Sequence, residues 1–187
     1  MHFRKPALDG PVLVEPVVHG DDRGFFVETF RKTELAELGL PECAEFVQEN
    51  HSRSRRGVVR GMHMQLGTGM AKLVRCARGA IVDVIVDVRP GSSTYGKWAS
   101  FELNDANHHQ LLVPVGFAHG FCVTSEVADV IYKQTAYYDP ELERGIAYND
   151  PDVGITWPLP AEELIISQRD AQAPLLRDIA PQLDFGH

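Results

Sequence analysis

The stretch Ala80–Gly91, AIVDVIVDVRPG, is the part of the sequence that most clearly indicates the fold. Its β-branched residues favour a strand, and the Pro-Gly pair at its end predicts a turn. Because side chains alternate along a strand, Asp83 and Asp87 share one face with Ile81 and Ile85. The stretch therefore predicts a strand whose apolar run is interrupted by two carboxylates on the same face.

Short strand-like runs separated by turn residues extend this pattern over most of the chain. The predicted strands are Pro11–Val18, Phe25–Phe30, Glu45–Asn50, Val58–Gln65, Lys72–Cys76, Ala80–Val88, Lys97–Leu103, Gln110–Val113, Phe117–Val123 and Asp129–Thr135. Short strands at this spacing are typical of an antiparallel sandwich or barrel. The chain has 187 residues, 44% of them apolar, which is enough for one sizeable core. We therefore expect a single all-β domain over residues 1–187.

Helix is predicted in two short places. Residues 31–41, RKTELAELGLP, contain good helix formers, with Thr33 as the cap and a stop between Gly39 and Pro41. Residues 167–176, SQRDAQAPLL, predict a second short helix that Pro174 interrupts.

Charge and cysteine content narrow the range of partners and compartments. The net charge is −8, which argues against a general attraction to nucleic acid or to an anionic membrane. An anionic ligand would need a local cluster of basic side chains. Cys43, Cys76 and Cys122 are far apart and form no CxxC pair, so neither a disulfide framework nor a zinc knuckle is indicated. With no signal-like run at residues 1–10 and no run long enough to span a bilayer, we expect a cytoplasmic protein.

The segment GSSTYGKW, residues 91–98, has the glycine and lysine spacing of a phosphate-binding loop. Trp98 stands where such loops carry the Ser or Thr that binds magnesium, and the residues that follow alternate as in a strand. The segment therefore predicts a hairpin turn instead of a nucleotide hydrolase.

Two glycine-broken strands carry histidines that could meet inside a small barrel. His63 lies in GVVRGMHMQ, residues 57–65, and His119 lies in VPVGFAHGF, residues 113–121. One interpretation is that His119 is a core histidine with a structural hydrogen bond. Another is a metal site, but Gln65 stands where a second ligand on the strand of His63 would lie, so the ligand set is incomplete.

Without a metal, these histidines suit proton transfer next to a bound anion. An unperturbed histidine has a pKa of about 6.5, which would allow His63 to take a proton at neutral pH. Tyr132 could return a proton, and Lys72 could stabilise the oxyanion formed when a proton leaves a carbon beside a carbonyl. Arg60 and His63 are three residues apart, so a regular strand would point them in opposite directions. Both can face one site only if Gly61 marks a bulge.

Seven ordered segments of the sequence are similar to those of one known enzyme family. They are DDRGFFVETF (21–30), FVQENHSRS (46–54), GVVRGMHMQ (57–65), AKLVRCARGAIVDVIVDVRPGSSTYGKW (71–98), LLVPVGFAHGF (111–121), YYDPELERGI (137–146) and SQRDAQAPLL (167–176). On these segments the chain resembles the dTDP-4-dehydrorhamnose 3,5-epimerases, cupin-fold enzymes of nucleotide-sugar synthesis. The resemblance implies a homodimer of jelly-roll barrels with a few short helices, using no metal and no organic cofactor.

The resemblance also implies a role for individual residues. His63 corresponds to the catalytic base, Asp170 to the carboxylate that pairs with it, Tyr132 to the proposed acid, and Lys72 to the lysine beside the substrate carbonyl oxygen. The residues expected to bind substrate are His119, the second active-site histidine; Arg23, Phe26 and Glu28 near the nucleotide; Gln48, Asn50, Ser52 and Arg60 near the diphosphate and sugar; and Tyr138, Glu143 and Arg169. Arginines suit a diphosphate and an aromatic ring suits the thymine face. For Arg23 and Glu28, a solvated surface pair is the alternative interpretation.

The implied reaction removes a proton from the carbons on either side of the C4 ketone of dTDP-4-dehydro-6-deoxy-D-glucose and returns it on the opposite face. The product would be dTDP-4-dehydro-L-rhamnose. The sequence departs from the family pattern in a shortened loop at residues 65–72, in Ala147 and Tyr148, and in Arg169, which replaces a common lysine. These departures leave open an epimerase that acts at C3 or C5 alone. The barrel is also compatible with a metal-dependent cupin enzyme or a sugar-binding cupin, and either Tyr132 or a water could return the proton.

Overall fold

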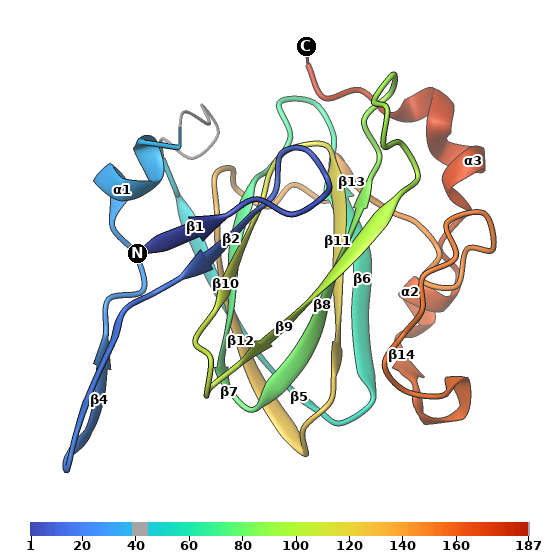
Figure 1. The fold of residues 1–187 in the computed structure, drawn as a ribbon. Coiled ribbons are helices and arrows are strands. Elements are labelled where there is room, and N and C mark those ends of the chain that lie inside the picture. The colour runs from blue at the N-terminus through green and yellow to red at the C-terminus, as the bar shows by residue number, and fades with distance from the viewer. Residues whose placement is uncertain (39–44, 187) are drawn as a thin grey trace.

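The computed structural model describes residues 1–38 and 45–186, and strands dominate this part of the chain (Figure 1). The strands are β1 (His2–Arg4), β2 (Val12–Glu15), β3 (Val18–Asp21), β4 (Gly24–Val27), β5 (Gln48–Arg55), β6 (Val58–Gln65), β7 (Lys72–Arg78), β8 (Ala80–Asp87), β9 (Trp98–Asn104), β10 (Gln110–Val113), β11 (Phe117–Val123), β12 (Val127–Gln134), β13 (Glu143–Gly145) and β14 (Ile165–Ile166). The helices are α1 (Lys32–Ala36), α2 (Gln168–Ala171) and α3 (Leu176–Ile179), with 3-10 turns η2 (Ala161–Glu163) and η3 (Ala180–Gln182). No helix in the described ranges is long and apolar enough to cross a membrane.

Two antiparallel sheets face each other and form the barrel expected from the sequence. One sheet has the order β1-β2-β10-β7-β12-β5, and the other has the order β13-β6-β11-β8-β9. A short parallel pairing adds β14 to the edge of β6. This arrangement is a cupin-type jelly roll, which confirms the predicted fold class.

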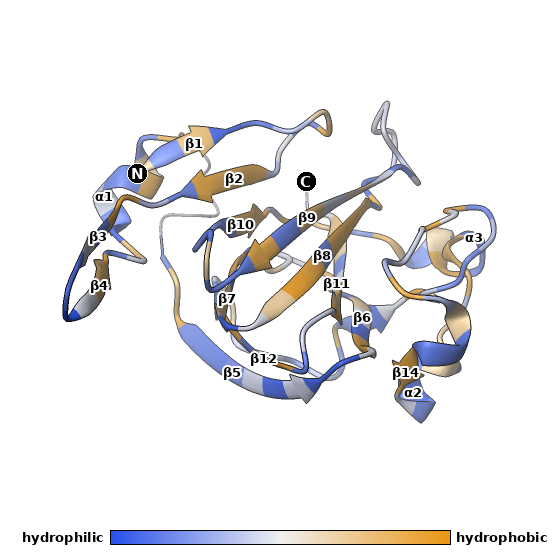
Figure 2. Cartoon of the chain, turned by 60° about the horizontal axis from the view of Figure 1, so that its bottom comes forward, coloured by the Kyte–Doolittle hydropathy of each residue, from blue (hydrophilic) through white to orange (hydrophobic). Residues whose placement is uncertain are grey.

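The strand β8 of the opening stretch is buried on both of its faces. Ile81 and Ile85 contribute to the core inside the barrel, whereas Val84 and Val86 pack on the outside against the C-terminal segment that contains α3. Figure 2 shows β8 as a largely hydrophobic strand, in contrast to the polar edge strand β5. The two-sided burial explains why the sequence of β8 is almost continuously apolar.

Most of the predicted elements are confirmed, with shifted ends. The run Pro11–Val18 contains β2 and ends at the first residue of β3, so most of β3 was not predicted. The strand β5 is longer than the predicted strand that starts at Glu45. The strands β1, β13 and β14 were not predicted because they have only two or three residues. Pro174 separates α2 from α3, as expected.

The predicted cap of the first helix is wrong. The N-cap of α1 is Arg31, without a side-chain capping bond, and Thr33 lies within the helix. The helix begins earlier than expected: Arg31 is extended and Lys32 is the first helical residue, so Thr33 lies too far along the chain to be the cap. The predicted stop between Gly39 and Pro41, like Cys43, lies outside the described residues.

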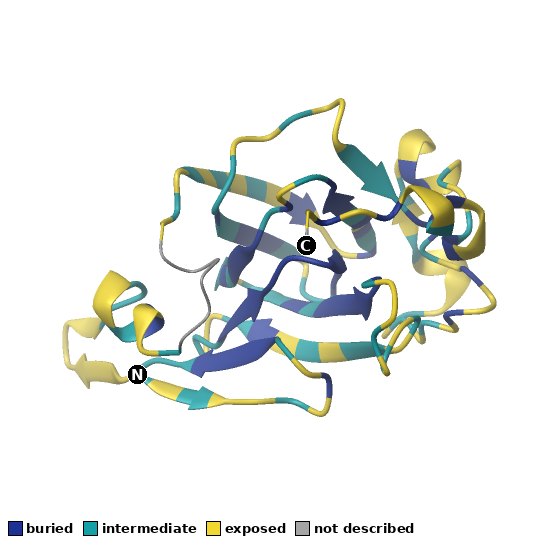
Figure 3. Cartoon of the chain, turned by 90° about the horizontal axis from the view of Figure 1, so that it is seen from above, coloured by how far each residue is buried: buried dark blue, intermediate teal, exposed yellow. Residues whose placement is uncertain are grey.

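The hairpin β3–β4 stands away from the barrel. It forms its own two-stranded sheet, and its residues are mostly exposed (Figures 1 and 3). Phe25 is 61% exposed and Phe26 is 70% exposed. Of these two rings, that of Phe25 packs on His108 of the barrel, with 4.5 Å between centroids. Exposed aromatic side chains on a projecting hairpin are typical of a surface that binds a partner.

Candidate active site

Two pockets lined by residues of the barrel share three of their lining side chains, and they are treated together as two lobes of one cleft. The first lobe has a volume of about 470 Å³ and is lined by Ser52, Val58, Val59, Arg60, His63, Lys72, His119, Phe121, Tyr132, Ile165, Ile166, Ser167, Arg169 and Asp170. The second has a volume of about 310 Å³ and is lined by Gln48, Asn50, His63, Met70, Lys72, Tyr132, Gln134, Tyr138 and Glu143. His63, Lys72 and Tyr132 line both lobes, so the predicted base, cation and acid lie where the lobes meet.

His63 is held by the predicted carboxylate. Its Nε2 lies 2.7 Å from Oδ1 of Asp170, which is the last but one residue of α2 and is buried. The hydroxyl of Ser167 caps α2 by accepting a bond from the Asp170 amide, which fixes the backbone next to this carboxylate. Burial acts to raise the pKa of Asp170, but the hydrogen bond and charge of His63 outweigh it, so the pKa lies below its ordinary value. An ionised Asp170 accepts Nε2–H and leaves Nδ1 of His63 free to take a proton.

The glycine that breaks β6 has a structural cause. Gly61 has φ +128°, and a Cβ at this position would lie 2.5 Å from Cα of Gly120 in β11. The register between the two strands shifts here: His63 pairs with His119, while Arg60 pairs with Phe121. Gly61 and Met62 of β6 thus lie opposite the single residue Gly120 of β11, and both Arg60 and His63 line the cleft. The irregularity expected at Gly61 is confirmed.

His119 is paired with a carboxylate that was not predicted as a site residue. Its Nε2 lies 2.9 Å from Oδ2 of Asp83, and the Asp83 side chain is fully buried. Both side chains point into the barrel from the neighbouring strands β11 and β8. The signal was present, because Asp83 occupies the inward face of an apolar strand, where an unpaired carboxylate would be costly.

Lys72 supplies a buried cation between the two lobes. It lies at the start of β7, is 8% exposed, and pairs in register with Gln134 of β12. Burial lowers the pKa of Lys72 to about 8, although the charges of Glu143 and Asp83 act in the opposite direction. At neutral pH the side chain is therefore mostly an ammonium that is poorly compensated by the protein, which favours an anion beside it.

Amide side chains line the second lobe. Gln48 Nε2 donates to Asn50 Oδ1 at 3.1 Å, and Asn50 donates to Gln134 Oε1. The Gln48 Oε1 atom accepts a bond from the Tyr138 amide at 2.9 Å, which ties β5 to the loop after β12. Gln134 was not predicted as a site residue. The signal was its position two residues from Tyr132, on the same face of the strand.

Arg169 links the two lobes of the cleft. Its Nη2 lies 2.6 Å from Oε2 of Glu143, and the Tyr138 hydroxyl donates to the same carboxylate oxygen at 3.0 Å. Arg169 lines the first lobe, whereas Glu143 and Tyr138 line the second. The structure thus brings together the three substrate-binding residues expected in the C-terminal third.

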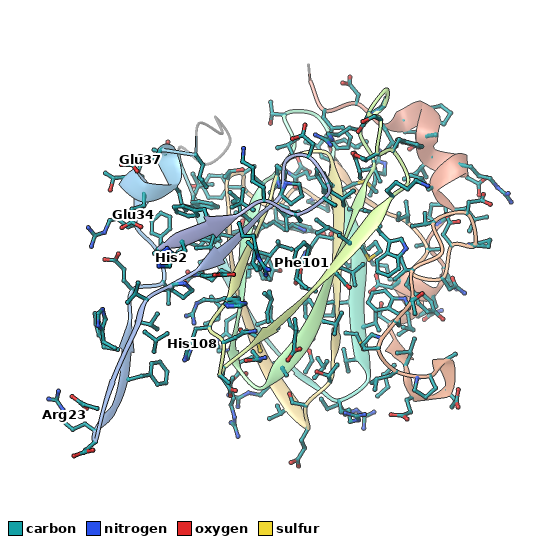
Figure 4. All side chains as sticks on the ribbon, viewed as in Figure 1. His2, Arg23, Glu34, Glu37, Phe101 and His108 are labelled. Atoms are coloured by element: carbon teal, nitrogen blue, oxygen red, sulfur yellow. The ribbon has the colours of Figure 1, made fainter. Side chains whose placement is uncertain are left out.

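Arg23, Phe26 and Glu28 lie away from the cleft of their own chain. Arg23 is at the tip of the projecting hairpin (Figure 4), with its side chain 89% exposed and paired with Asp21. Glu28 pairs with Arg31 at 2.7 Å. None of the three lines either lobe of the cleft.

Acid–base groups, and not a cluster of metal ligands, characterise the cleft. Within residues 1–38 and 45–186, no three His, Cys, Asp or Glu side chains are grouped so that they could hold a metal ion. Each cleft histidine is paired with one carboxylate, and the lysine and tyrosine lie nearby. A cupin barrel with this set of groups defines an isomerase-type site that moves protons.

Comparisons with known proteins identify the family. The sequence model of the dTDP-4-dehydrorhamnose 3,5-epimerases matches residues 5–178, and the chain belongs to this family. It is 47% identical to the enzyme of that name from Methanothermobacter thermautotrophicus, over 94% of this chain and 95% of the relative. The crystal structure of dTDP-6-deoxy-D-glucose-3,5-epimerase from Legionella pneumophila, in complex with dTDP-4-keto-L-rhamnose, is 44% identical. It superimposes with a TM-score of 0.93, covering 98% of this chain and 97% of that one.

One relative has a narrower activity in its name. The dTDP-4-dehydrorhamnose 3-epimerase of Streptomyces niveus is 38% identical, over 95% of this chain and 85% of the relative. Membership of the family therefore makes this chain an epimerase, and the number of carbons that it inverts requires a separate test.

Proposed function

We propose that this enzyme epimerises dTDP-4-dehydro-6-deoxy-D-glucose at C3 and C5 to give dTDP-4-dehydro-L-rhamnose. The observation that carries the proposal is that His63, Lys72 and Tyr132 line both lobes of the cleft. A sugar ring placed there would have a base, a cation and a phenol beside it. The reaction needs those three groups.

The chemistry follows from the protonation of these groups. Nδ1 of His63 takes the proton from C3 or C5, and the electrons of the C–H bond move to the C4 oxygen to form an enolate. The ammonium of Lys72 stabilises this oxyanion more strongly in the buried cleft than it would in water. Tyr132 returns a proton to the carbon on the opposite face, and the ketone re-forms. His63 then releases its proton to solvent and Tyr132 takes one up from solvent, which restores both groups for the second carbon. Because the same ketone activates both carbons, one Lys72 serves both steps.

The direct test is turnover of dTDP-4-dehydro-6-deoxy-D-glucose in heavy water, followed by NMR and mass spectrometry of the product. We expect deuterium at both C3 and C5 and loss of turnover in a His63→Asn variant. Deuterium at C3 alone would support the second candidate, a 3-epimerase like the Streptomyces niveus relative. Wild-type rates that fall after chelation and recover with added metal would instead indicate a metal-dependent cupin enzyme.

The position of the hairpin supports a homodimer as part of this proposal. Arg23, Phe26 and Glu28 are expected to contact the nucleotide, yet none of them lines the cleft of their own chain. A second copy reconciles this expectation with the observed position if each hairpin reaches the cleft of its partner. The exposed ring of Phe26 would then be covered, and Arg23 would meet the diphosphate or the nucleotide base.

Mixing two inactive variants tests this arrangement. Arg23→Ala removes the hairpin cation and His63→Asn removes the base, so each homodimer should be impaired. If hairpins act on the partner, a mixed dimer contains one cleft with both defects and one intact cleft. Each mixed dimer should then have about half of the wild-type activity. If hairpins act within their own chain, each cleft of the mixed dimer carries one defect and activity does not return. Analytical ultracentrifugation of the wild type establishes the dimer independently.

The proposal assigns the reaction to the cytoplasm, with a dTDP-sugar as substrate and no metal or organic cofactor. The absence of a cofactor from this proposal is supported by the chemistry: each step of the proposed reaction is a proton transfer to or from a side chain of the cleft. The free, buried thiols of Cys76 and Cys122 are consistent with a reducing compartment.

A further inference from the structure

The hydrogen bonds between His119 and Asp83 determine which ring nitrogen of His119 carries the proton. His119 is 7% exposed and Asp83 is fully buried, and the Nε2 atom of the ring lies within 2.9 and 3.1 Å of both carboxylate oxygens. A carboxylate accepts hydrogen bonds and does not donate them, so the proton of a neutral His119 ring belongs on Nε2. This arrangement leaves Nδ1 as the nitrogen with a free lone pair.

That free nitrogen is open to the cleft. Among the described residues, Ser52 Oγ is the one buried side-chain nitrogen or oxygen that has no hydrogen-bond partner. The hydrogen bonds of His119 to Asp83 are made by Nε2, and His119 lines the first lobe, so Nδ1 is the ring nitrogen left for a ligand there. A ligand in the first lobe can therefore reach it.

The surroundings of His119 keep the ring neutral. Burial lowers the pKa of His119 and outweighs the opposing charge and hydrogen bond of Asp83. The positive charges of Lys72 and His63 lower it further. When His63 takes the proton from the substrate it becomes an imidazolium, so a second proton on His119 is least favourable at the moment of reaction.

We propose that Asp83 is a positioning residue that fixes His119 with its proton on Nε2, so that Nδ1 accepts a hydrogen bond from a hydroxyl of the bound sugar. This inference rests on the proposed function for the identity of the ligand. It separates the roles of two neighbouring groups: Lys72 donates to the C4 oxygen, and His119 accepts from a hydroxyl beside it. A sugar without that hydroxyl would leave a buried acceptor unpaired, so His119 contributes to the choice of substrate.

The tautomer can be measured without any substrate. In protein labelled with ¹⁵N-histidine, we expect His119 at pH 7 to show a protonated Nε2 and an unprotonated Nδ1. Asp83→Asn presents either an oxygen or an NH₂ group to the ring, so we expect a mixture of both tautomers. Asp170→Asn is the matched control: it should change the signals of His63 and leave the tautomer of His119 as it is. A wild-type His119 that is protonated on Nδ1, or on both nitrogens, would overturn the proposal.

Two isosteric variants test the acceptor role. The amide of His119→Asn occupies the place of Nδ1 and can present an acceptor to the cleft, whereas the amide of His119→Gln occupies the place of Nε2 and faces Asp83. We expect KM for the dTDP-sugar to rise at least about 10-fold more in His119→Gln than in His119→Asn, since a lost hydrogen bond to a buried polar group weakens binding by this order. Equal values for the two variants would refute the acceptor role. Absence of turnover in the wild type would refute the proposed function, while the tautomer would still decide the role of Asp83.

Discussion

Lys72 allows a quantitative prediction, because its burial makes the stability of the protein depend on pH. Burial lowers the pKa of Lys72 from 10.5 in an exposed lysine to about 8 in the folded protein. Each unit of pKa difference corresponds to about 1.4 kcal/mol, so keeping Lys72 charged costs the folded state about 3 kcal/mol at neutral pH. The cost is fully present below about pH 8. It is relieved between pH 8 and 10.5, where the folded protein releases the proton before the unfolded chain does.

The Lys72→Met variant isolates this effect, because methionine keeps the length of the side chain and removes the charge. Other groups also titrate in this range, so the quantity to compare is the change in unfolding free energy between pH 7 and pH 10 in each protein. We expect urea denaturation to show that the wild type gains about 2 to 3 kcal/mol more over this interval than Lys72→Met does.

Equal pH dependence in the two proteins would refute the reasoning, since it would mean that Lys72 has the same pKa in the folded and unfolded states. A larger gain in Lys72→Met would mean that the cleft stabilises the ammonium, which is the opposite of the expected sign. In either case Lys72 would not be the poorly compensated cation that favours an oxyanion beside it.

Three further predictions concern the same cleft. In the wild type, kcat/KM should fall about tenfold per pH unit above pH 8 if the ammonium of Lys72 is required, and a flat profile up to pH 9.5 would argue against that requirement. Asp170→Asn should lower kcat by about 10² or more, because His63 loses the group that fixes its tautomer, while dTDP binding measured by calorimetry changes little; a rate within threefold of the wild type would contradict this role. Gly61→Ala should destabilise the protein by about 2 to 5 kcal/mol in urea, because its Cβ would clash with the backbone of β11 at a positive φ. The control Gly91→Ala has a positive φ but no atom within 4 Å of the added Cβ, so it should cost about 1 kcal/mol, and equal losses would contradict the clash.

The strands could be predicted from the sequence because the order of apolar and polar residues along each strand depends on which of its faces are buried. Ala80–Asp87 carries apolar residues on both faces, and the structure packs it on both faces. Pairing partners could not be predicted in this way. The short strand β14 is stabilised by its parallel pairing with β6, and nothing local in Ile165–Ile166 indicates that partner. Similarly, α1 starts after Arg31, which makes no side-chain capping bond, so the usual capping residues do not indicate this start.

The site residues could be predicted in part, since histidines, lysines and glycines in apolar strands are unusual enough to be noticed. The pairing of His63 with Asp170 came from the resemblance to a family, and the structure places the two at 2.7 Å. The carboxylate that pairs with His119 was missed, although Asp83 was correctly placed on one face of its strand with Ile81 and Ile85. Two residues on neighbouring strands meet only through the strand order and register, and one sequence without pairing information does not specify these.

The cleft requires both the irregularity in β6 and the free-energy cost of burying the charged Lys72. A regular β6 would direct Arg60 and His63 to opposite faces, so a cleft that uses both needs the extra residue at Gly61. A neutral side chain at position 72 would remove the burial cost, but it would not stabilise an oxyanion. A cleft with that function therefore retains the cost of a buried ammonium. Both features lower stability locally, and both are tolerated because β6, β8 and β11 are packed on two sides by apolar residues. Variants that weaken the outer packing of β8, such as Val84→Ala, should therefore lower stability while leaving the pH dependence of kcat/KM unchanged, which would separate support of the barrel from the chemistry inside it.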